Sequence, residues 1–212
     1  MKEWLPNHPK AGLMAKKRAV ILDAAREAFL RDGYEATSMD SIAARAGVSI
    51  MTLYRHAQGK DDLFAAVVEG ACHPDKQGEQ AEVEDYLHRP LGEVLTLVGQ
   101  IIQTRLSDPT TIALFRAVIA ESSRHPQLAT MAYNGLVRSH EDALETYLGQ
   151  RKEGAGIDPG QRRRLSARFV DQLVGVDSFR LLLGLEGASE AEQLERAAEA
   201  AADLISQLKA RP

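Results

Sequence analysis

The chain has one cysteine, few aromatic residues and no long apolar run. Because Cys72 has no second cysteine to pair with, an internal disulfide is excluded, and a lone thiol suits a reducing cytoplasm. No uninterrupted apolar stretch reaches the ~18 residues typical of a membrane-spanning helix. The N-terminal stretch also lacks the continuous apolar core of a secretory signal. We therefore expect a cytoplasmic protein that makes no use of a membrane.

Strand signals and enzyme motifs are missing as well. No segment alternates apolar and polar residues between turn signals with an enrichment in β-branched side chains, so β-strands are not expected. The chain has no H-E-x-x-H motif, no paired CxxC, no GxGxxG or Walker-type loop and no nucleophile elbow. The pairs left as candidates for chemistry are Glu121 with His125, His140 with Glu141, and Cys72 with His73. The i, i+4 spacing of the first pair favours a surface ion pair, and we expect no enzyme, no metal and no cofactor.

The net charge of −4 is unevenly distributed along the chain. Residues 1–60 contain ten Lys or Arg against six Asp or Glu, whereas the remainder contains 16 basic and 24 acidic residues. A cationic segment attracts phosphate groups, and an acidic one discourages non-specific wrapping along nucleic acid. The asymmetry therefore indicates a phosphate-seeking surface in the N-terminal part of the chain.

Helical periodicity covers most of the sequence. The first helix is expected over 16–32, with Gly33 as its stop, and another begins at Lys60 and reaches Gly70. Later helical patterns occupy 90–107, 109–124, 126–149, 159–185 and 188–209. Four of these begin near a proline, which costs little in a first helical turn because its missing N–H would be unpaired there. The chain is therefore predicted to be all-α.

Two short helical patterns joined by a turn occupy residues 37–63, TSMDSIAARAGVSIMTLYRHAQGKDDL. The first, 39–46, is preceded by hydroxyl-bearing side chains that can act as N-caps, and Gly47 is suited to leave a helix with positive φ. Ser49 can cap the second, 50–56. Two helices joined by a short turn that contains glycine are the sequence form of a helix-turn-helix, whose second helix enters the DNA major groove.

Several residues in and before this segment carry a resemblance to a known family. They are Ile21, Ala24, Phe29, Gly33, Tyr34, Thr37, Ile42, Ala43, Ala46, Gly47, Val48, Ser49, Thr52, Leu53, Tyr54, His56 and Lys60. Their order resembles the DNA-binding domain of the TetR family of bacterial transcriptional regulators over roughly residues 17–64. Ala57 departs from the aromatic residue usual at this point, and Ile50 and Met51 stand where many members carry polar or small residues.

The resemblance implies an all-α fold in which an N-terminal three-helix helix-turn-helix head is joined to a helical body for ligand binding and dimerisation. We expect a flexible arm over 1–15, the head over 16–59 and the body over 60–212. The stretch LFRAVIAESSRHPQLATMAYN at 114–134 resembles the C-terminal regulatory domain of an AefR-like branch of the family. That second resemblance names no ligand.

Phosphate contacts position a head of this kind, and base contacts read the sequence. The predicted DNA-binding residues are Thr37, Ser38, Ser49, Ile50, Met51, Thr52, Tyr54, Arg55, His56 and Lys60. Thr37 and Ser38 are expected to hold one phosphate from a helix N-terminus, and Lys60 to anchor the opposite side. The resemblance assigns phosphate contacts to residues 54–56. A packed tyrosine and a structurally bonded histidine are the alternatives there.

The first turn of the second helix, residues 49–52, is the part that meets base edges. Ile50 and Met51 cannot form bidentate hydrogen bonds with guanine or adenine, but they can contact the C5-methyl group of thymine. We therefore expect an operator with thymines under these two side chains. The alternative is that either side chain packs back onto the head.

The last two helical patterns carry wide apolar faces with small residues, which predict a dimer interface. Its expected residues are Phe169, Leu173, Val176, Leu194, Ala198, Ala201 and Ile205, with packing inside one chain as the alternative. The middle helices carry a second apolar set that could line a ligand pocket or be plain core. This set comprises Leu97, Ile101, Phe115, Ile119, Met131, Tyr133, Leu136 and His140.

Together these features predict a ligand-responsive transcriptional regulator. The family resemblance implies a repressor that binds a palindromic double-stranded DNA operator as a homodimer and is released by a small-molecule effector. A non-sensing architectural DNA-binding protein is the main alternative. An enzyme and a head that has lost DNA binding, leaving an interaction protein, are the others.

Overall fold

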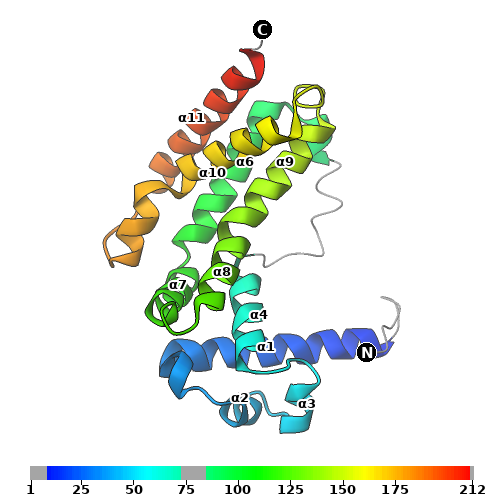
Figure 1. Ribbon diagram of the computed structural model, residues 1–212, viewed down its shortest axis with the longest axis vertical. Helices are drawn as coiled ribbons and strands as arrows, with labels where there is room; N and C mark the ends of the chain where they lie inside the picture. Colours follow the sequence, from blue (N-terminus) through cyan, green and yellow to red (C-terminus); the bar gives the residue numbers. More distant parts are fainter. Residues whose placement is uncertain (1–8, 73–84, 211–212) are drawn as a thin grey trace. The chain divides into compact units, whose positions relative to one another are not determined.

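The computed structural model describes residues 9–72 and 85–210, and every regular element in these two ranges is helical (Figure 1). The prediction of an all-α chain is confirmed. The chain forms two compact units: unit 1 comprises Met1–Gly70 with Ala113–Ala132, and unit 2 comprises Ala71–Ile112 with Tyr133–Pro212. Among the described helices, none combines the length and the apolar character needed to span a bilayer.

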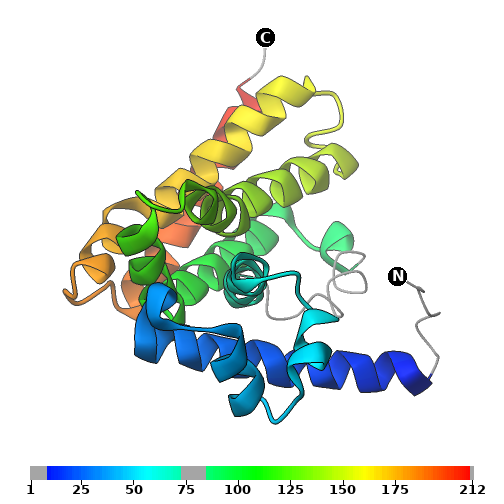
Figure 2. The ribbon, with the colours of Figure 1, turned by 60° about the horizontal axis from the view of Figure 1, so that its bottom comes forward.

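Unit 1 is built on one long helix, α1, which spans Pro9–Ala36. The other helices that contribute to it are α2 (Met39–Arg45), α3 (Ile50–Tyr54), α4 (Lys60–Cys72), α7 (Pro109–Glu121) and α8 (Pro126–Tyr133). Helix α2 packs against both α1 and α3, and Figures 1 and 2 show α2 and α3 lying beside α1.

Helix α1 begins earlier than the sequence indicated. Residues 9–15 are helical, so this part of the predicted flexible arm is wrong, and residues 1–8 lie outside the described residues. Proline is tolerated in a first helical turn, and the Ala, Leu, Met and Lys residues that follow are good helix formers. Leu13 and Met14 stay 57% and 42% exposed, so helix propensity rather than packing supports this extension. Gly33, with φ 79°, kinks the last turn of α1 in a conformation that glycine adopts at little cost.

Three aromatic rings form the centre of unit 1, and we call them the aromatic core. Phe29 and Tyr34 come from α1 and Phe64 from α4, and none is more than 2% exposed. Phe64 meets the edges of the other two rings at centroid distances of 4.9 and 5.2 Å, and Phe29 stacks on Tyr34 at 5.8 Å. Aromatic pairs in such geometries contribute about 0.5–1.5 kcal/mol each beyond their buried area. The aromatic core therefore joins α1 to α4.

Side-chain caps fix the start of both short helices. Ser38 and Ser41 form a reciprocal capping box, in which each hydroxyl oxygen accepts the backbone N–H of the other residue at 3.1 and 3.2 Å. The Ser49 hydroxyl oxygen accepts the backbone N–H of Thr52 at 3.2 Å. Gly47, with φ 63°, makes the turn between the two helices. Both predicted helices are present, and each ends one or two residues before its predicted limit.

Unit 2 is a helical bundle whose central contacts are made by α6 (Leu91–Ser107), α10 (Pro159–Leu182) and α11 (Glu190–Lys209). Helix α6 packs along α11, and α10 packs against α6, α11 and α9 (Ser139–Gln150). One π-helical turn, η1 (Asn134–Arg138), precedes α9. The later helical patterns predicted from the sequence are therefore found, except that the pattern over 126–149 is divided into α8, η1 and α9.

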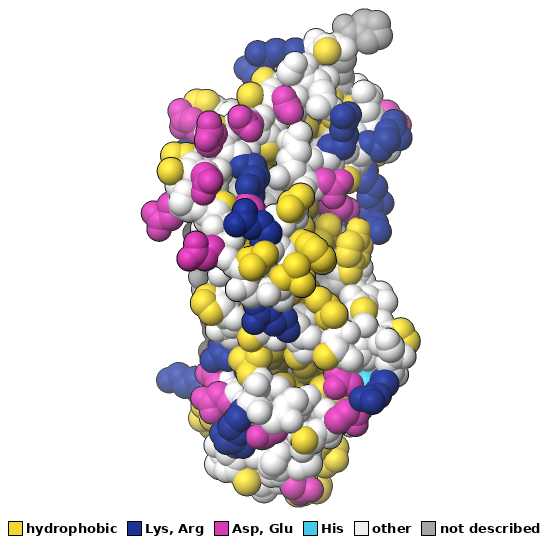
Figure 3. Space-filling view, turned by 90° about the vertical axis from the view of Figure 1, so that its left-hand side faces the viewer, with side chains coloured by type: hydrophobic (Ala, Val, Ile, Leu, Met, Phe, Trp, Pro, Cys, Tyr) yellow, Lys and Arg dark blue, Asp and Glu magenta, His cyan; other side chains and the backbone are white. Residues whose placement is uncertain are grey.

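Apolar side chains stay exposed where α10 ends. Gly175, with φ 37° and ψ −160°, kinks this helix. The large apolar residues that are exposed beyond the kink are Val176 (75%), Phe179 (63%), Leu183 (63%) and Leu185 (55%), together with Leu194 (45%) of α11. Figure 3, which views the left-hand side of Figure 1, shows hydrophobic side chains gathered on this side of the molecule. We call the five residues the α10 patch.

The predicted dimer interface is only partly exposed. Its exposed members are Val176, Leu194 and Ala198. Its buried members are Phe169, Leu173 and Ala201, each no more than 2% exposed within the core of unit 2, so an interface role is wrong for them. Ile205 is partly buried against the same core. The physical reason is that one wide apolar helical face contains both buried core residues and exposed residues. The sequence pattern does not distinguish between them.

Gly99 marks a close approach of α6 and α11. A Cβ atom at this position would lie 2.9 Å from the Ala197 Cβ and 3.2 Å from the Leu173 Cδ2. Gly99→Ala is expected to lower the free energy of unfolding by about 1–3 kcal/mol, because overpacking outweighs the gain in helix propensity. Urea unfolding measures this change. Gly92→Ala on the same helix is the control, since its nearest neighbour is the Ile205 Cδ1 at 3.4 Å, and equal stability of both variants would contradict the close packing.

Candidate functional site

The outward face of α3 carries most of the residues expected to meet DNA. Met51 is 67% exposed and Tyr54 51% exposed, and Ser49 and Arg55 are exposed at the two ends of the helix. Leu53 points the other way and is fully buried. The alternative in which Met51 or Tyr54 packs into the head is therefore not what the structure shows.

The other two residues of the first turn of α3, Ile50 and Thr52, are partly buried. Ile50 is half-buried, so it shares its surface between the head and the exterior. Thr52 is also half-buried, and its hydroxyl lies 2.9 Å from that of Ser49. The exposed part of the first turn is thus dominated by Ser49 and Met51.

His56 lies just beyond α3 and is half-buried. Arg18 of α1 donates from Nη1 to the His56 carbonyl oxygen at 3.0 Å, which ties the exit of α3 to α1. Burial, followed by the positive charges of Arg18 and Lys17, lowers the pKa of the His56 imidazole below its usual value. The neutral imidazole therefore prevails at pH 7.

Thr37 does not present its hydroxyl to a phosphate, so that prediction is wrong. The residue is 2% exposed, and its Oγ1 hydroxyl donates to the carbonyl oxygens of Gly33 at 2.7 Å and Ala28 at 3.2 Å. The bond to Gly33 satisfies one of the last four carbonyl groups of α1, which lack intrahelical partners. Ser38 remains exposed at the N-terminus of α2, where a phosphate could be met.

Lys60 also points into unit 1. Its ammonium donates to the carbonyl oxygens of Tyr34 at 2.9 Å and Glu35 at 3.2 Å, and it lies 4.4 Å from the centroid of the Tyr34 ring. A cation at a helix C-terminus interacts favourably with the carbonyl groups there. Lys60 thus closes the end of α1, and its contact with a phosphate stays a prediction.

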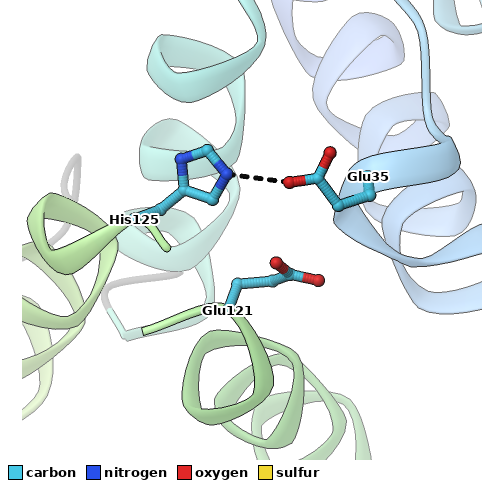
Figure 4. A group of neighbouring side chains, drawn as sticks. All are labelled: Glu35, Glu121 and His125. Atoms are coloured by element: carbon cyan, nitrogen blue, oxygen red, sulfur yellow. Dashed lines mark hydrogen bonds and ion pairs between the residues drawn. The ribbon is translucent and has the colours of Figure 1, made fainter. Parts of the chain in front are cut away.

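A polar cluster that no sequence pattern predicted joins α1 to the end of α7 and the start of α8. The His125 Nε2 lies 2.9 Å from a Glu35 carboxylate oxygen (Figure 4), and the His125 ring meets the Tyr34 ring at 4.8 Å. The expected ion pair between His125 and Glu121 is therefore replaced by a pair with Glu35. Because 90 positions separate the two partners, no local pattern announces the contact.

Neighbouring bonds extend this cluster to α4. The Tyr34 hydroxyl and the Gln127 side-chain amide both donate to the Asp61 carboxylate, the second at 3.0 Å. The bond from Tyr34 holds the pKa of the Asp61 carboxyl below its usual range, and burial raises the pKa of the Tyr34 phenol. The bond from His125 likewise lowers the pKa of Glu35. Ionised Asp61 and Glu35 carboxylates and a protonated Tyr34 phenol are therefore the stable forms at neutral pH.

Glu35, Glu121 and His125 form the one group of side chains, among the described residues, whose ligand atoms approach a metal-binding arrangement. These atoms lie within 4.8 Å of one another, whereas a tetrahedral ion with bonds of about 2.1 Å holds its ligands roughly 3.5 Å apart. The histidine nitrogen is already bonded to Glu35, and a Glu121 oxygen is buried 3.8 Å from Arg124 without a hydrogen bond. The arrangement is that of a hydrogen-bonded contact, and the absence of a metal stays a prediction.

Unit 2 contains a cavity of about 200 Å³. One wall is a face of α6 that carries Val94, Val98, Ile101 and Arg105, at helical spacing. Side chains of α9 and α10 form most of the rest of the lining, and Tyr147 of α9 donates its hydroxyl to the Tyr86 carbonyl oxygen at 3.1 Å. The concave, mostly apolar shape is that of a small-molecule site.

Two of the eight predicted ligand-binding residues, Ile101 and His140, line this cavity. The others do not. Leu97, Leu136 and Tyr133 lie elsewhere in unit 2, and Phe115, Ile119 and Met131 belong to unit 1. The physical reason is that the helical segments carrying the last three fold with the head. Arg105 also lines the cavity and was not predicted to do so. Its position as a cation on an otherwise apolar face of α6 could have indicated it.

Comparison with known proteins extends these observations to a family. Residues 21–67 match the bacterial regulatory proteins, tetR family, and residues 93–208 match the AefR-like transcriptional repressor, C-terminal domain. The uncharacterized HTH-type transcriptional regulator YvkB of Bacillus subtilis is 31% identical over 172 residues, which cover 77% of this chain and 82% of that protein.

Solved structures agree on the fold. A TetR-family regulator from Mesorhizobium loti aligns with a TM-score of 0.70 at 22% identity, over 92% of this chain and 97% of its own. The flavonoid-responsive regulator FrrA aligns with a TM-score of 0.62 at 26% identity, over 91% of this chain and 96% of its own. With the exposed face of α3 and both family matches in agreement, the chain belongs to the tetR family of DNA-binding bacterial transcriptional regulators.

Proposed function

We propose that the protein is a transcriptional repressor that binds a palindromic operator as a homodimer and leaves it when a small molecule occupies the cavity of unit 2. The observation that carries the proposal is the geometry of α3, where Met51 and Tyr54 are exposed opposite a fully buried Leu53. A helix held in this way presents a fixed set of side chains to the major groove. The AefR-like match supports repression, because that family description names a transcriptional repressor.

The α10 patch supports the dimer. Monomeric proteins seldom expose large contiguous apolar surfaces, and a two-fold dimer buries the same patch on both copies. One helix-turn-helix head reads only a few base pairs. Two heads related by a two-fold axis match two half-sites about one helical turn apart.

The cavity supports the response to a ligand. FrrA, whose name describes it as flavonoid-responsive, is 26% identical to this chain. A ligand releases DNA only if it favours an arrangement of the dimer that binds the operator less well. The cavity is built by α6, α9 and α10, and α10 also carries Val176 and Phe179 of the α10 patch, so occupancy and dimer geometry share one helix.

Selection of bound fragments from random duplex DNA tests the proposal. It should return a palindrome with half-sites about one turn apart and with thymines under Ile50 and Met51. Replacing these thymines by uracil should weaken binding roughly fourfold for each methyl group removed from the interface, at about 0.8 kcal/mol per buried methyl group, measured by titration. Met51→Ala should reduce this sensitivity. No enriched sequence, or an asymmetric single site, would argue against the proposed mode of binding.

The inward position of Lys60 predicts a separable effect on stability and on DNA binding. Lys60→Met should lower the free energy of unfolding by about 0.3–1 kcal/mol, because the end of α1 then has no cation beside its carbonyl groups. The slope of log affinity against log salt concentration on the selected operator should not change. Arg55→Met is the comparison, because removal of one phosphate contact reduces that slope by about 0.9. A similar reduction for Lys60→Met would show that Lys60 reaches a phosphate in the complex.

The dimer makes a prediction for the α10 patch. Phe179 is 63% exposed, and Phe179→Asp places a charge in the proposed interface. We expect the wild type to scatter light as a dimer at micromolar concentration and this variant as a monomer with unchanged helical content. Ile119→Asp, at a position of α7 that is 55% exposed, is the matched control and should remain dimeric. A monomeric wild type, or a dimeric Phe179→Asp variant, would refute this interface.

A further inference from the structure

We infer that the cavity of unit 2 binds a small apolar carboxylate, whose charged group is held by Arg105. The inference rests on the proposed response to a ligand and specifies the chemical class of that ligand. It is drawn from the size of the cavity, from the character of its wall and from the environment of one arginine.

The volume of the cavity suits a compact molecule. A dry apolar cavity of about 150 Å³ accepts benzene. The cavity of unit 2, at about 200 Å³, therefore has room for one aromatic ring with a short substituent or for a folded chain of similar volume. Aliphatic and aromatic side chains such as Val98, Leu144 and Phe169 form most of its wall, which favours an apolar skeleton.

The positive charge of Arg105 favours a negatively charged group on the ligand. The lining of the cavity includes Arg105 and no Asp or Glu. Arg105 is half-buried, and its guanidinium makes no hydrogen bond or ion pair with any residue that the structure describes. Its five N–H donors are therefore free to meet an acceptor on a ligand in the cavity.

The other partly buried arginines of unit 2 show how unusual this is. Each of them has an ion pair with a carboxylate of the same unit: Arg89 with Glu93, Arg151 with Glu153, Arg162 with Glu145, and Arg196 with Asp177. Arg151 and Arg162 also donate to backbone carbonyl oxygens. Within the described part of unit 2, Arg105 is the partly buried arginine that lacks such a partner, and it lines the cavity.

A carboxylate supplies what Arg105 lacks. Its two oxygens can accept two parallel N–H bonds from the planar guanidinium, a geometry that a neutral hydroxyl cannot reproduce. Tyr147 does not compete for this role, because its hydroxyl already donates to the Tyr86 carbonyl oxygen. An alcohol of the same skeleton offers the guanidinium one uncharged oxygen, so its hydrogen bond is weaker than those of a carboxylate.

Isothermal titration of the full chain with matched acid and alcohol pairs tests the inference. Benzoate and octanoate are compared with benzyl alcohol and 1-octanol at pH 7.5. At least one acid should bind ten or more times as tightly as the alcohol with its skeleton. Arg105→Met should reduce the affinity for that acid to the level of the alcohol, while Arg105→Lys retains part of the preference.

Arg164→Met is the matched control, since Arg164 is exposed in the second turn of α10 and does not line the cavity. It should bind like the wild type, and thermal unfolding should confirm that every variant is folded. Equal binding of acid and alcohol, a preference that survives in Arg105→Met, or no binding of either acid would overturn the inference.

Operator release is measured separately, by adding the same four compounds to the complex with the selected DNA. Release by an alcohol but not by an acid would leave the proposed function standing and reject the carboxylate. Acid binding that depends on Arg105 without release would support the site and reject the proposed response.

Discussion

A helix of five residues cannot persist in water through its own hydrogen bonds, since isolated helices need roughly 12–15 residues to be even marginally stable. Helix α3 has five and α2 has seven. They owe their shape to local caps and to the burial of Leu53 and Ile42, which are fully inaccessible. The aromatic core joins the two longer helices α1 and α4, and α2 packs against α1 and α3. We expect the outward face of α3 to depend on that core for its position.

The same constraint decides which polar groups remain available to DNA. Thr37 and Lys60 both satisfy carbonyl groups near the end of α1, and the backbone carbonyl of His56 is held by Arg18. These three groups are engaged within unit 1 rather than turned outward. Few of the predicted DNA-binding side chains therefore face outward, and the apolar side chain of Met51 is one of the most exposed among them.

Features set by neighbours in sequence could be predicted, and features set by distant contacts could not. The caps at Ser38 and Ser49 and the turn at Gly47 depend on a few adjacent residues, and the sequence located both short helices to within two positions. The contact of His125 with Glu35 and the cavity beside Arg105 arise from packing between distant segments. The apolar face of α10 was found, but its division between core and surface follows from a kink at Gly175 and from the neighbours of each turn.

Amide hydrogen exchange of the intact chain tests most directly the claim that the aromatic core holds the recognition helix. We predict that the amides of α3 exchange only when that core opens. In a Phe64→Leu variant, their exchange should accelerate together with that of the α1 turn around Phe29, while the turn of α10 around Phe169 keeps its wild-type rate. If α3 exchanges freely in the wild type, or keeps its protection while α1 loses its own, the recognition helix does not depend on the aromatic core.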